Sequence, residues 1–286
     1  MKTLTCLFAA AAVTASLFMP AHAGAVINVA GFTSNVISPQ SFGRLDDGSA
    51  LASIGFNIDF YGATQSSLYV NNNGNVSLDG ALAAYSPSPL ASLTSRLIAP
   101  FFADVDTRAA GTNGSDVVRF GTDTLDGRKV FGVNWINVGY YNYGTDRLNS
   151  FQLVMTDRSD IRDGDFDFTF NYDRIEWNVG QATNPADKAR SGYTGGSSAS
   201  AFELSHFGVP QVPFITIAPP NSLVNNSLNS SVTGRYNFQV RNGAVAAYVA
   251  DAAPAPANDV PEPASLLLAG LGLIALGVSR RSVQRA

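Results

Sequence analysis

Alternating apolar and polar positions mark the first extended segment of the chain. In residues 54–60, isoleucine and phenylalanine alternate with small or polar residues. A period of two places the apolar side chains on one face, so a half-buried β-strand is predicted here. Residues 67–70 and 74–78 flank three asparagines at 71–73. Asparagine and glycine tolerate left-handed backbone angles, which predicts a β-hairpin with its turn at these asparagines.

The same period and the same turn residues recur along the chain. Further strands are predicted at residues 130–138, 150–156, 166–172, 214–218, 236–240 and 244–249. Glycine, asparagine and aspartate separate these segments, and no stretch of the body has both the length and the period of an amphipathic helix. We therefore expect an all-β fold, an antiparallel β-sandwich or barrel-like single domain.

Composition agrees with a turn-rich fold and excludes several chemistries. Of 286 residues, 26 are glycine and 14 are proline, whereas charged residues make up 14%. The formal net charge is −4, and an acidic body without a basic stripe argues against nucleic acid as a partner. The single cysteine is Cys6, in the N-terminal segment, so we expect a body without disulfides, thiol nucleophile or zinc–thiolate site.

The N-terminal segment has the three parts of a secretory signal peptide. A lysine near the start is followed by an apolar stretch, and Ala21 and Ala23 form a small-residue cleavage site before Gly24. We expect residues 1–23 to form a signal helix that is removed on export. Residues 24–251 then form the exported β-rich domain.

The C-terminal segment combines a spacer, an apolar stretch and a basic end. Residues 252–263 are rich in alanine and proline, which predicts an extended linker. Residues 264–278 carry no charge, and arginines follow before the chain ends at 286. As a helix rising about 1.5 Å per residue, this stretch is about 22 Å long and is short for a hydrocarbon core of about 30 Å. We expect a short hydrophobic helix that anchors weakly.

These C-terminal elements stand in the order of a bacterial sorting signal. Its residues are Val260, Pro261, Glu262, Pro263, Arg280 and Arg281. The arrangement resembles the PEP-CTERM signal of Gram-negative bacteria. That resemblance implies processing by an exosortase, transient attachment to the inner membrane through this segment only, and delivery to the cell surface or extracellular matrix. An ordinary membrane anchor is the alternative.

A second resemblance lies in the middle of the chain. Residues 97–107 read Leu-Ile-Ala-Pro-Phe-Phe-Ala-Asp-Val-Asp-Thr, similar to the opening signature of the nidogen-like (NIDO) domain. Residues 148–152, 170–177 and 189–193 follow in the order that this family shows. The resemblance covers residues 54–207 approximately. It implies an extracellular β-rich module of adhesion or matrix proteins, without an established catalytic centre.

Aspartates offer the best candidates for a metal site. Asp104 and Asp106 are two positions apart, so on a strand both carboxylates leave the same face and could hold calcium, the one cofactor candidate. The alternative is that both cap turns and accept hydrogen bonds from backbone amides. Residues 163–167 carry three more aspartates, but phenylalanines alternate with them, which favours the solvated face of a strand.

Candidates for catalysis are few. His206 is the only histidine outside the signal segment, and no G-x-S-x-G motif accompanies it. Glu176 is the most plausible acid for a carboxylate pair of the glycosidase type. Tyr140, Tyr141 and Tyr143 lie between two predicted strands and either offer aromatic faces to sugars or proteins, or pack over the end of the sandwich.

Taken together, the two terminal signals and the sparse chemistry favour a non-enzymatic exported protein. The leading hypothesis is a surface or matrix protein that acts in adhesion or associates with exopolysaccharide or other surface proteins. The alternatives are a secreted polysaccharide hydrolase and a calcium-dependent carbohydrate-binding module.

Overall fold

The computed structural model describes residues 24–37, 43–178, 188–204 and 222–246. Contacts divide the chain into two units, Met1–Ala246 and Ala247–Ala286, and all described residues belong to the first. Several expected elements lie outside the described residues, namely the signal helix, the linker, the C-terminal hydrophobic helix and the strand at 214–218, as does His206.

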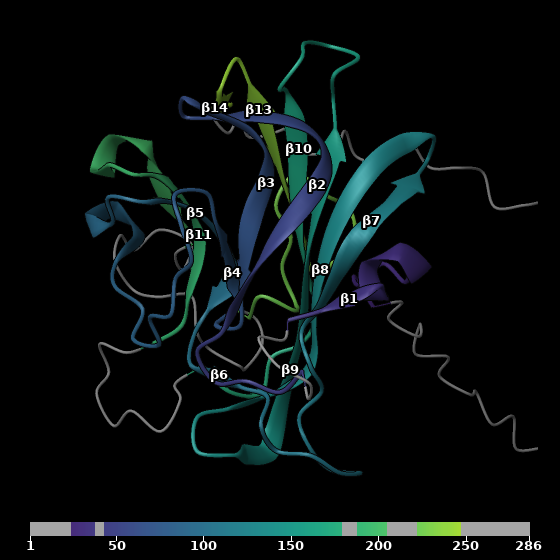
Figure 1. Ribbon diagram of the computed structural model, residues 1–286, viewed down its shortest axis with the longest axis vertical. Coiled ribbons are helices and arrows are strands. Elements are labelled where there is room, and N and C mark those ends of the chain that lie inside the picture. The colour runs from purple at the N-terminus through teal and green to yellow at the C-terminus, as the bar shows by residue number, and fades with distance from the viewer. Residues whose placement is uncertain (1–23, 38–42, 179–187, 205–221, 247–286) are drawn as a thin grey trace, which may run out of the picture. The chain divides into compact units, whose positions relative to one another are not determined.

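The described body is built from two antiparallel sheets (Figure 1). The eight-stranded sheet contains β1 (Asn35–Val36), β6 (Val105–Asp106), β7 (Arg119–Leu125), β8 (Arg128–Tyr140), β9 (Gly144–Asp157), β10 (Phe166–Arg174), β13 (Arg235–Arg241) and β14 (Ala244–Val245). The six-stranded sheet contains β2 (Ser49–Phe60), β3 (Ala63–Asn71), β4 (Asn75–Ser77), β5 (Arg96–Phe102), β11 (Arg190–Gly195) and β12 (Ala201–Glu203). In the larger sheet the order is β1-β7-β8-β9-β10-β13-β14 with β6 on β8, and in the smaller it is β12-β11-β5-β4-β3-β2.

Both sheets turn an apolar face toward a shared core. In β10 the four alternating aromatics predicted from the sequence, Phe166, Phe168, Phe170 and Tyr172, are all buried. From the opposite sheet Phe60 packs against Phe166 with ring centroids 6.1 Å apart, and Phe101 packs against Phe151 at 5.2 Å. The all-β sandwich is therefore confirmed. Burial of these large rings removes apolar surface from water and so favours pairing of the two sheets.

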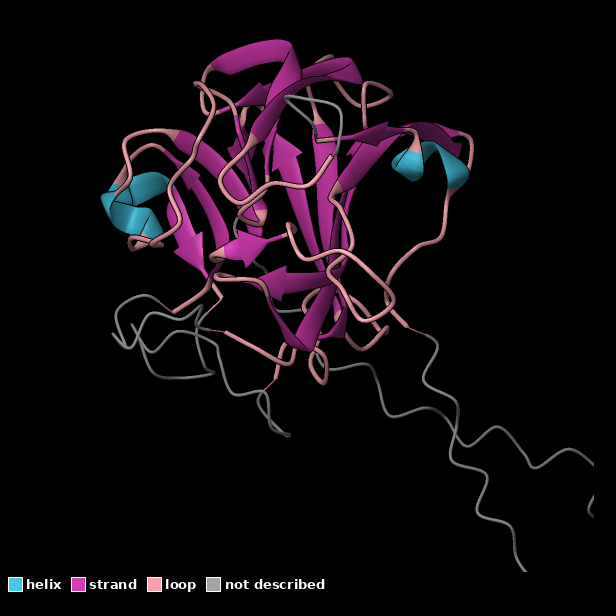
Figure 2. Ribbon diagram, turned by 60° about the horizontal axis from the view of Figure 1, so that its bottom comes forward, coloured by secondary structure: helices cyan, strands magenta, loops and turns pink. Residues whose placement is uncertain are grey.

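Helical structure in the described ranges is confined to short turns (Figure 2). These are the 3-10 segments η1 (Ala30–Thr33), η2 (Leu90–Ser92) and η4 (Ser198–Ser200). Within these ranges there is no helix with the length and apolar character needed to cross a membrane.

Cross-strand pairing forms the predicted hairpin, and hydrogen bonds hold the first described residues of the body. β3 and β4 pair with Asn71 opposite Asn75, so the hairpin with its asparagine turn is confirmed. At the start of the body, the Val26 amide donates a hydrogen bond to the Asp173 carboxylate at 2.9 Å, and the Arg235 guanidinium donates to the carbonyl oxygen of Ala25 at 2.8 Å. The start of the body is thereby tied to β10 and β13.

Candidate functional site

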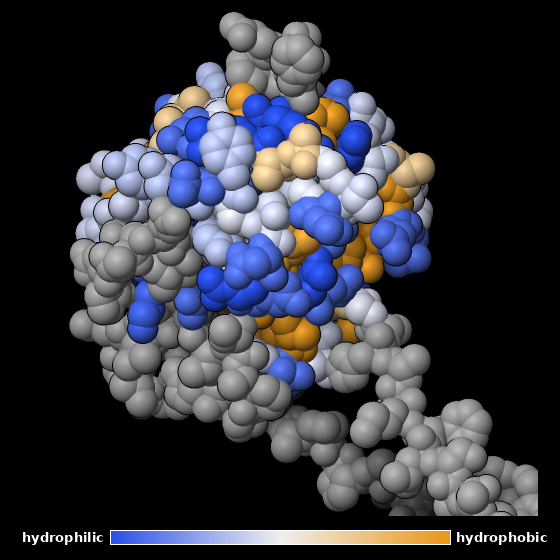
Figure 3. Space-filling model, turned by 90° about the horizontal axis from the view of Figure 1, so that it is seen from below, coloured by the Kyte–Doolittle hydropathy of each residue, from blue (hydrophilic) through white to orange (hydrophobic). Residues whose placement is uncertain are grey.

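Three carboxylates meet next to β6. β6 lies at the end of the body that Figure 3 views, where hydrophilic and hydrophobic side chains both reach the described surface. The three carboxylates belong to Asp46, Asp47 and Asp104, and we call them the aspartate cluster. One oxygen from each lies within 4.8 Å of the others. Two ligands on opposite sides of a calcium ion bound at about 2.4 Å are about 4.8 Å apart, so the spacing suits such an ion.

The backbone around the aspartate cluster is held by hydrogen bonds between distant segments. The Leu45 amide donates a hydrogen bond to the Thr107 hydroxyl at 2.8 Å, and the Thr107 amide donates to the Leu45 carbonyl oxygen at 2.8 Å. Asn73 donates from Nδ2 to Asp47 at 2.8 Å and accepts the Val105 amide at 2.9 Å. Loop 43–48, the β3–β4 turn and the β5–β6 junction therefore form one scaffold, which preorganises the carboxylates.

Several oxygens at this place are buried without a hydrogen-bond donor in the part of the chain that the structure describes. They are Oδ1 of Asp46, Oδ1 of Asp104 and Oδ1 of Asn72. Asn72 is only 1% exposed, and its Nδ2 donates hydrogen bonds to the backbone carbonyls of Asp46, a member of the cluster, and of Val105, which follows Asp104. A buried oxygen without a donor is costly, because nothing replaces the water it lost.

Burial and mutual repulsion raise the pKa values of two members of the cluster, Asp46 and Asp104. Burial, followed by the charges of Asp46 and Asp47, raises the pKa of Asp104 to about 7. Burial and the charge of Asp106 raise the pKa of Asp46 to about 6, although Arg108 opposes this. A cation in the cluster would relieve the repulsion that a proton otherwise relieves.

Asp106 has a different role from Asp104. Its carboxylate pairs with Arg108 at 2.6 Å and accepts the backbone amides of Arg108 at 2.8 Å and Tyr143 at 3.0 Å. Burial acts to raise the pKa of Asp106, but these hydrogen bonds hold it below its usual value. Asp106 thus shows the amide-capping geometry of the alternative interpretation, and the structure groups Asp104 with Asp46 and Asp47 instead. In the sequence, the only sign of these partners of Asp104 was the adjacent pair Asp46 and Asp47, which precedes β2.

The comparisons with known proteins bear on this scaffold. The nidogen-like domain family matches residues 66–242, which is more than half of the chain. The chain belongs to this family. The matched part of the nidogen-like domain contains Asn72 and Asp104, while Asp46 and Asp47 precede it. It begins later and ends later than the span of 54–207 expected from the sequence.

Relatives of the domain occur within much longer proteins. Alpha-tectorin of Mus musculus is 29% identical over 224 residues, which cover 69% of this chain and 10% of that protein. Nidogen of Drosophila melanogaster is 28% identical over 199 residues, covering 57% of this chain and 14% of nidogen. The chain therefore spans only a small part of the length of these relatives. No solved structure matches the chain.

The C-terminal resemblance is confirmed as well. The PEP-CTERM protein-sorting motif matches residues 259–281, which include every sorting residue named above. The chain is accordingly an exported surface protein that carries a substrate signal for exosortase processing. The motif lies outside the described residues, so its recognition rests on the sequence match.

The remaining candidates of the nidogen-like domain make structural contacts. Glu176 accepts the Leu148 amide at 2.8 Å and lies 3.9 Å from the Arg174 guanidinium. In the β8–β9 turn, Tyr141 is 44% and Tyr143 is 56% exposed, and Arg108 lies over the Tyr143 ring at 4.6 Å. Tyr140, in contrast, packs against the buried Trp177 with ring centroids 5.8 Å apart. The three tyrosines therefore divide between the two interpretations.

The three aspartates of residues 163–167 are not equivalent. Asp165 is 2% exposed and accepts the Asn242 amide at 2.9 Å, so the expected solvated position is wrong for this residue. Asp167 pairs with Arg158 at 2.7 Å and with Arg241 at 2.6 Å. Asp163 is exposed and reaches Asn57. These carboxylates fasten β10 and the preceding loop to their neighbours.

Proposed function

We propose that this protein is a non-enzymatic component of the bacterial cell surface or extracellular matrix. It acts in adhesion or in association with exopolysaccharide, after the exosortase has processed its C-terminal segment. The observation that carries the proposal is the union of a nidogen-like domain with a PEP-CTERM motif in one chain. The names of the relatives, alpha-tectorin and nidogen, are consistent with an extracellular setting.

A deletion strain tests the proposal directly. Loss of the protein should reduce surface attachment or retention of exopolysaccharide in the matrix, and the wild-type gene should restore both. A complementing gene that lacks residues 259–281 is the control for sorting, and it should fail to restore them. Unchanged attachment and retention in a strain that normally displays the protein abundantly would contradict the proposed role.

The same protein can be tested for hydrolysis. Incubation with exopolysaccharide from the producing cells should release no oligosaccharides if the protein only binds. Turnover that Glu176→Gln abolishes would replace the proposal with the hydrolase alternative. The structural contacts of Glu176 with Leu148 and Arg174 are the reason to expect no turnover.

The aspartate cluster supports a second candidate function, calcium-dependent binding. Its spacing, its buried oxygens without donors and the raised pKa values of Asp46 and Asp104 all favour a bound cation. Asp46, Asp47 and Asp104 would hold the ion, with Asn72 Oδ1 available nearby and water completing the six to eight oxygens that calcium takes.

Thermal unfolding decides whether calcium binds at the cluster. At pH 8, calcium at about 100 times its dissociation constant should stabilise the protein by about 2.7 kcal/mol, and EDTA should reverse the effect. Asp104→Asn should remove this response, whereas Asp126→Asn, in an exposed turn, should leave it intact. A calcium response that survives in Asp104→Asn would place the ion elsewhere.

A further inference from the structure

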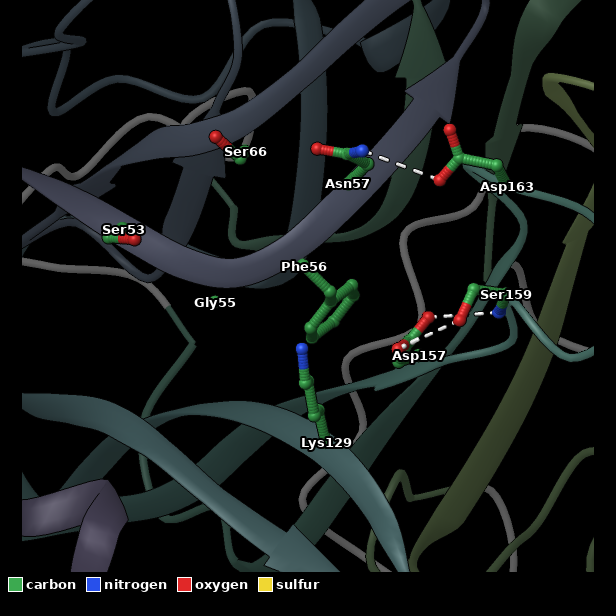
Figure 4. Close-up of a pocket in the computed structure, with 9 residues that line it drawn as sticks. All are labelled: Ser53, Gly55, Phe56, Asn57, Ser66, Lys129, Asp157, Ser159 and Asp163. Atoms are coloured by element: carbon green, nitrogen blue, oxygen red, sulfur yellow. Dashed lines mark hydrogen bonds between the residues drawn. The ribbon is translucent and has the colours of Figure 1, made fainter.

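An open polar pocket lies where β2 and β3 face the loop between β9 and β10 (Figure 4). Its volume is ≈ 480 Å³, within the range of about 300–1,000 Å³ typical of small-molecule sites. The lining residues are Ser53, Gly55, Phe56, Asn57, Ser66, Lys129, Asp157, Ser159 and Asp163. Lys129 lies near the start of β8, whereas β6, next to Asp104 of the aspartate cluster, pairs with the other end of β8 at Tyr140. The pocket and the cluster therefore lie toward opposite ends of this strand.

A bulged, irregular stretch of β2 forms one wall of the pocket. The β2–β3 register passes from Ser53 opposite Ser67 directly to Ile58 opposite Gln65. Residues 54–57 of β2 therefore face only Ser66 and have no cross-strand partner of their own. Gly55 has a φ of +87°, a backbone conformation that favours glycine. Bulges of this kind re-aim side chains and are common next to functional sites.

The opposite wall is fixed to β2 by hydrogen bonds. The Asp59 amide donates to the Gly164 carbonyl at 2.8 Å, and Arg162 pairs with Asp59 at 3.2 Å. Asn57 donates to Asp163 at 3.4 Å across the pocket edge. The β9–β10 loop is thus held against the bulge, so the two walls keep their spacing without a ligand.

The pocket presents both donors and acceptors for a polar ligand. Figure 4 shows the Lys129 side chain reaching into the space between the two walls. Among the described residues Lys129 has no ion pair and no side-chain hydrogen bond. Asp157 accepts both the amide and the hydroxyl of Ser159, at 2.9 and 3.1 Å, which fixes its orientation while leaving acceptor capacity.

We propose that this pocket binds a saccharide unit of an exported polysaccharide. Asp157, Asp163 and Asn57 accept hydrogen bonds from sugar hydroxyls, while Lys129 and the hydroxyls of Ser53 and Ser66 donate to sugar oxygens. The volume accommodates one or two sugar rings. The pocket holds two carboxylates, Asp157 and Asp163, and one ammonium group, Lys129. This net negative charge disfavours binding of phosphate and other multiply charged anions. The inference rests on the proposed association with exopolysaccharide and assigns it to a place on the nidogen-like domain.

Saturation-transfer NMR with the mature protein tests the pocket. The probes are glucose, galactose, mannose, glucuronic acid and cellobiose, with inorganic phosphate as the competing anion. At least one saccharide should bind, and Lys129→Met and Asp157→Asn should each weaken its binding about tenfold or more. Asp157→Asn retains an oxygen for the Ser159 amide, so the fold should persist, and an unchanged melting temperature verifies this.

Lys188→Met and Asp126→Asn are the matched controls, since neither residue lines the pocket. Binding that both pocket variants leave unchanged, binding of none of the saccharides, or preferential binding of phosphate would each overturn the inference. If no saccharide binds but the deletion strain still loses matrix retention, the proposed function stands and the pocket assignment falls. A saccharide bound in the pocket, with normal attachment and retention in the deletion strain, supports the pocket and contradicts the cellular role.

Discussion

Asp104 links the chemistry of the aspartate cluster to the stability of the fold. The groups that face it are Asp46, Asp47, Asp106 and Arg108, and three of these four are acidic. Burial and those negative charges favour the protonated form, so its pKa rises from 3.8 to about 7. A proton and a metal ion are therefore alternative ways to neutralise the same repulsion.

This competition predicts an unusual pH dependence without metal. The folded protein retains a proton at Asp104 up to about pH 7, whereas the unfolded chain releases it near 3.8. The folded state binds more protons between these values, so this group's contribution to stability is lost as pH rises through about 7. In EDTA, Asp104→Asn should be less sensitive than the wild type between pH 5 and 8, and more stable at pH 8.

The measurement is the melting temperature against pH, with Asp126→Asn as the control. A net effect of about 1 kcal/mol would shift the melting temperature by about 2–4 °C in a domain of this size. If the wild type and Asp104→Asn show parallel curves from pH 5 to 8, the raised pKa is wrong.

Gly74 illustrates a residue whose lack of a side chain permits the turn beside the cluster. Its φ is +74°, and a Cβ atom there would lie 1.8 Å from the carbonyl oxygen of Phe101. Gly74→Ala should therefore destabilise the protein by about 2 kcal/mol or more. Gly127→Ala is the control that separates backbone strain from steric overlap of the added Cβ. Gly127 has a φ of +77°, but no heavy atom lies within 4 Å of its added Cβ. Denaturant unfolding should show the larger loss for Gly74, and equal losses would refute a role for the close approach.

At the scale of the element, β10 connects the sandwich. It pairs with β9 on one side and β13 on the other, and Phe168 stacks on Phe238 of β13 with centroids 4.7 Å apart. Tyr193 of β11 meets the Phe168 ring from the other sheet at 5.9 Å. One aromatic side chain therefore contributes both to a neighbouring strand pair and to packing between the sheets.

Removal of that ring should be severe. Phe168→Ala is expected to cost about 3–5 kcal/mol, because it leaves a cavity between the sheets. Gln239→Ala, on the exposed face of β13, should change stability by no more than about 0.5 kcal/mol. Urea unfolding of both variants measures the difference, and a loss below about 1 kcal/mol for Phe168→Ala would show that the core repacks around the gap.

Some strands were predictable from the sequence by their alternation, and others, such as β8 and β9, by apolar runs that the structure largely buries. β2 alternates between buried and exposed positions and was expected in part, as was β10. β5 is buried along almost its whole length, so it carries no period of two, and β11 contains two glycines within six residues. Neither was predicted as a strand. β5 lacks a period of two because both of its faces are covered, and the two glycines of β11 weaken its strand signal.

At the scale of the whole molecule, the candidate site depended on contacts that local sequence does not show. Asp104 was identified from its spacing to Asp106, yet its partners Asp46 and Asp47 come from a loop before β2. Their proximity follows from the hydrogen bonds of Leu45 with Thr107 and of Asn73 with Val105. Such contacts between distant segments arise only once both sheets have formed.

Processing of the C-terminus is the prediction that concerns the entire chain. Mass spectrometry of protein outside the cell should find a chain that ends near Pro261, Glu262 or Pro263. A strain without the exosortase should instead retain the intact C-terminus in the inner membrane. An intact chain outside the wild-type cell would contradict processing and leave only an anchor or simple secretion.

The contacts of the first described residues constrain when the protein can finish folding. Ala25 and Val26 are bound by Arg235 and Asp173, which follow them by 210 and 147 positions. Contacts of such sequence separation form late, because much of the chain must be ordered to bring their ends together. During translocation the N-terminal part of the body emerges first and must wait for its last strands. Secretion therefore has to deliver the chain through residue 235 before the contact between Arg235 and Ala25 can form.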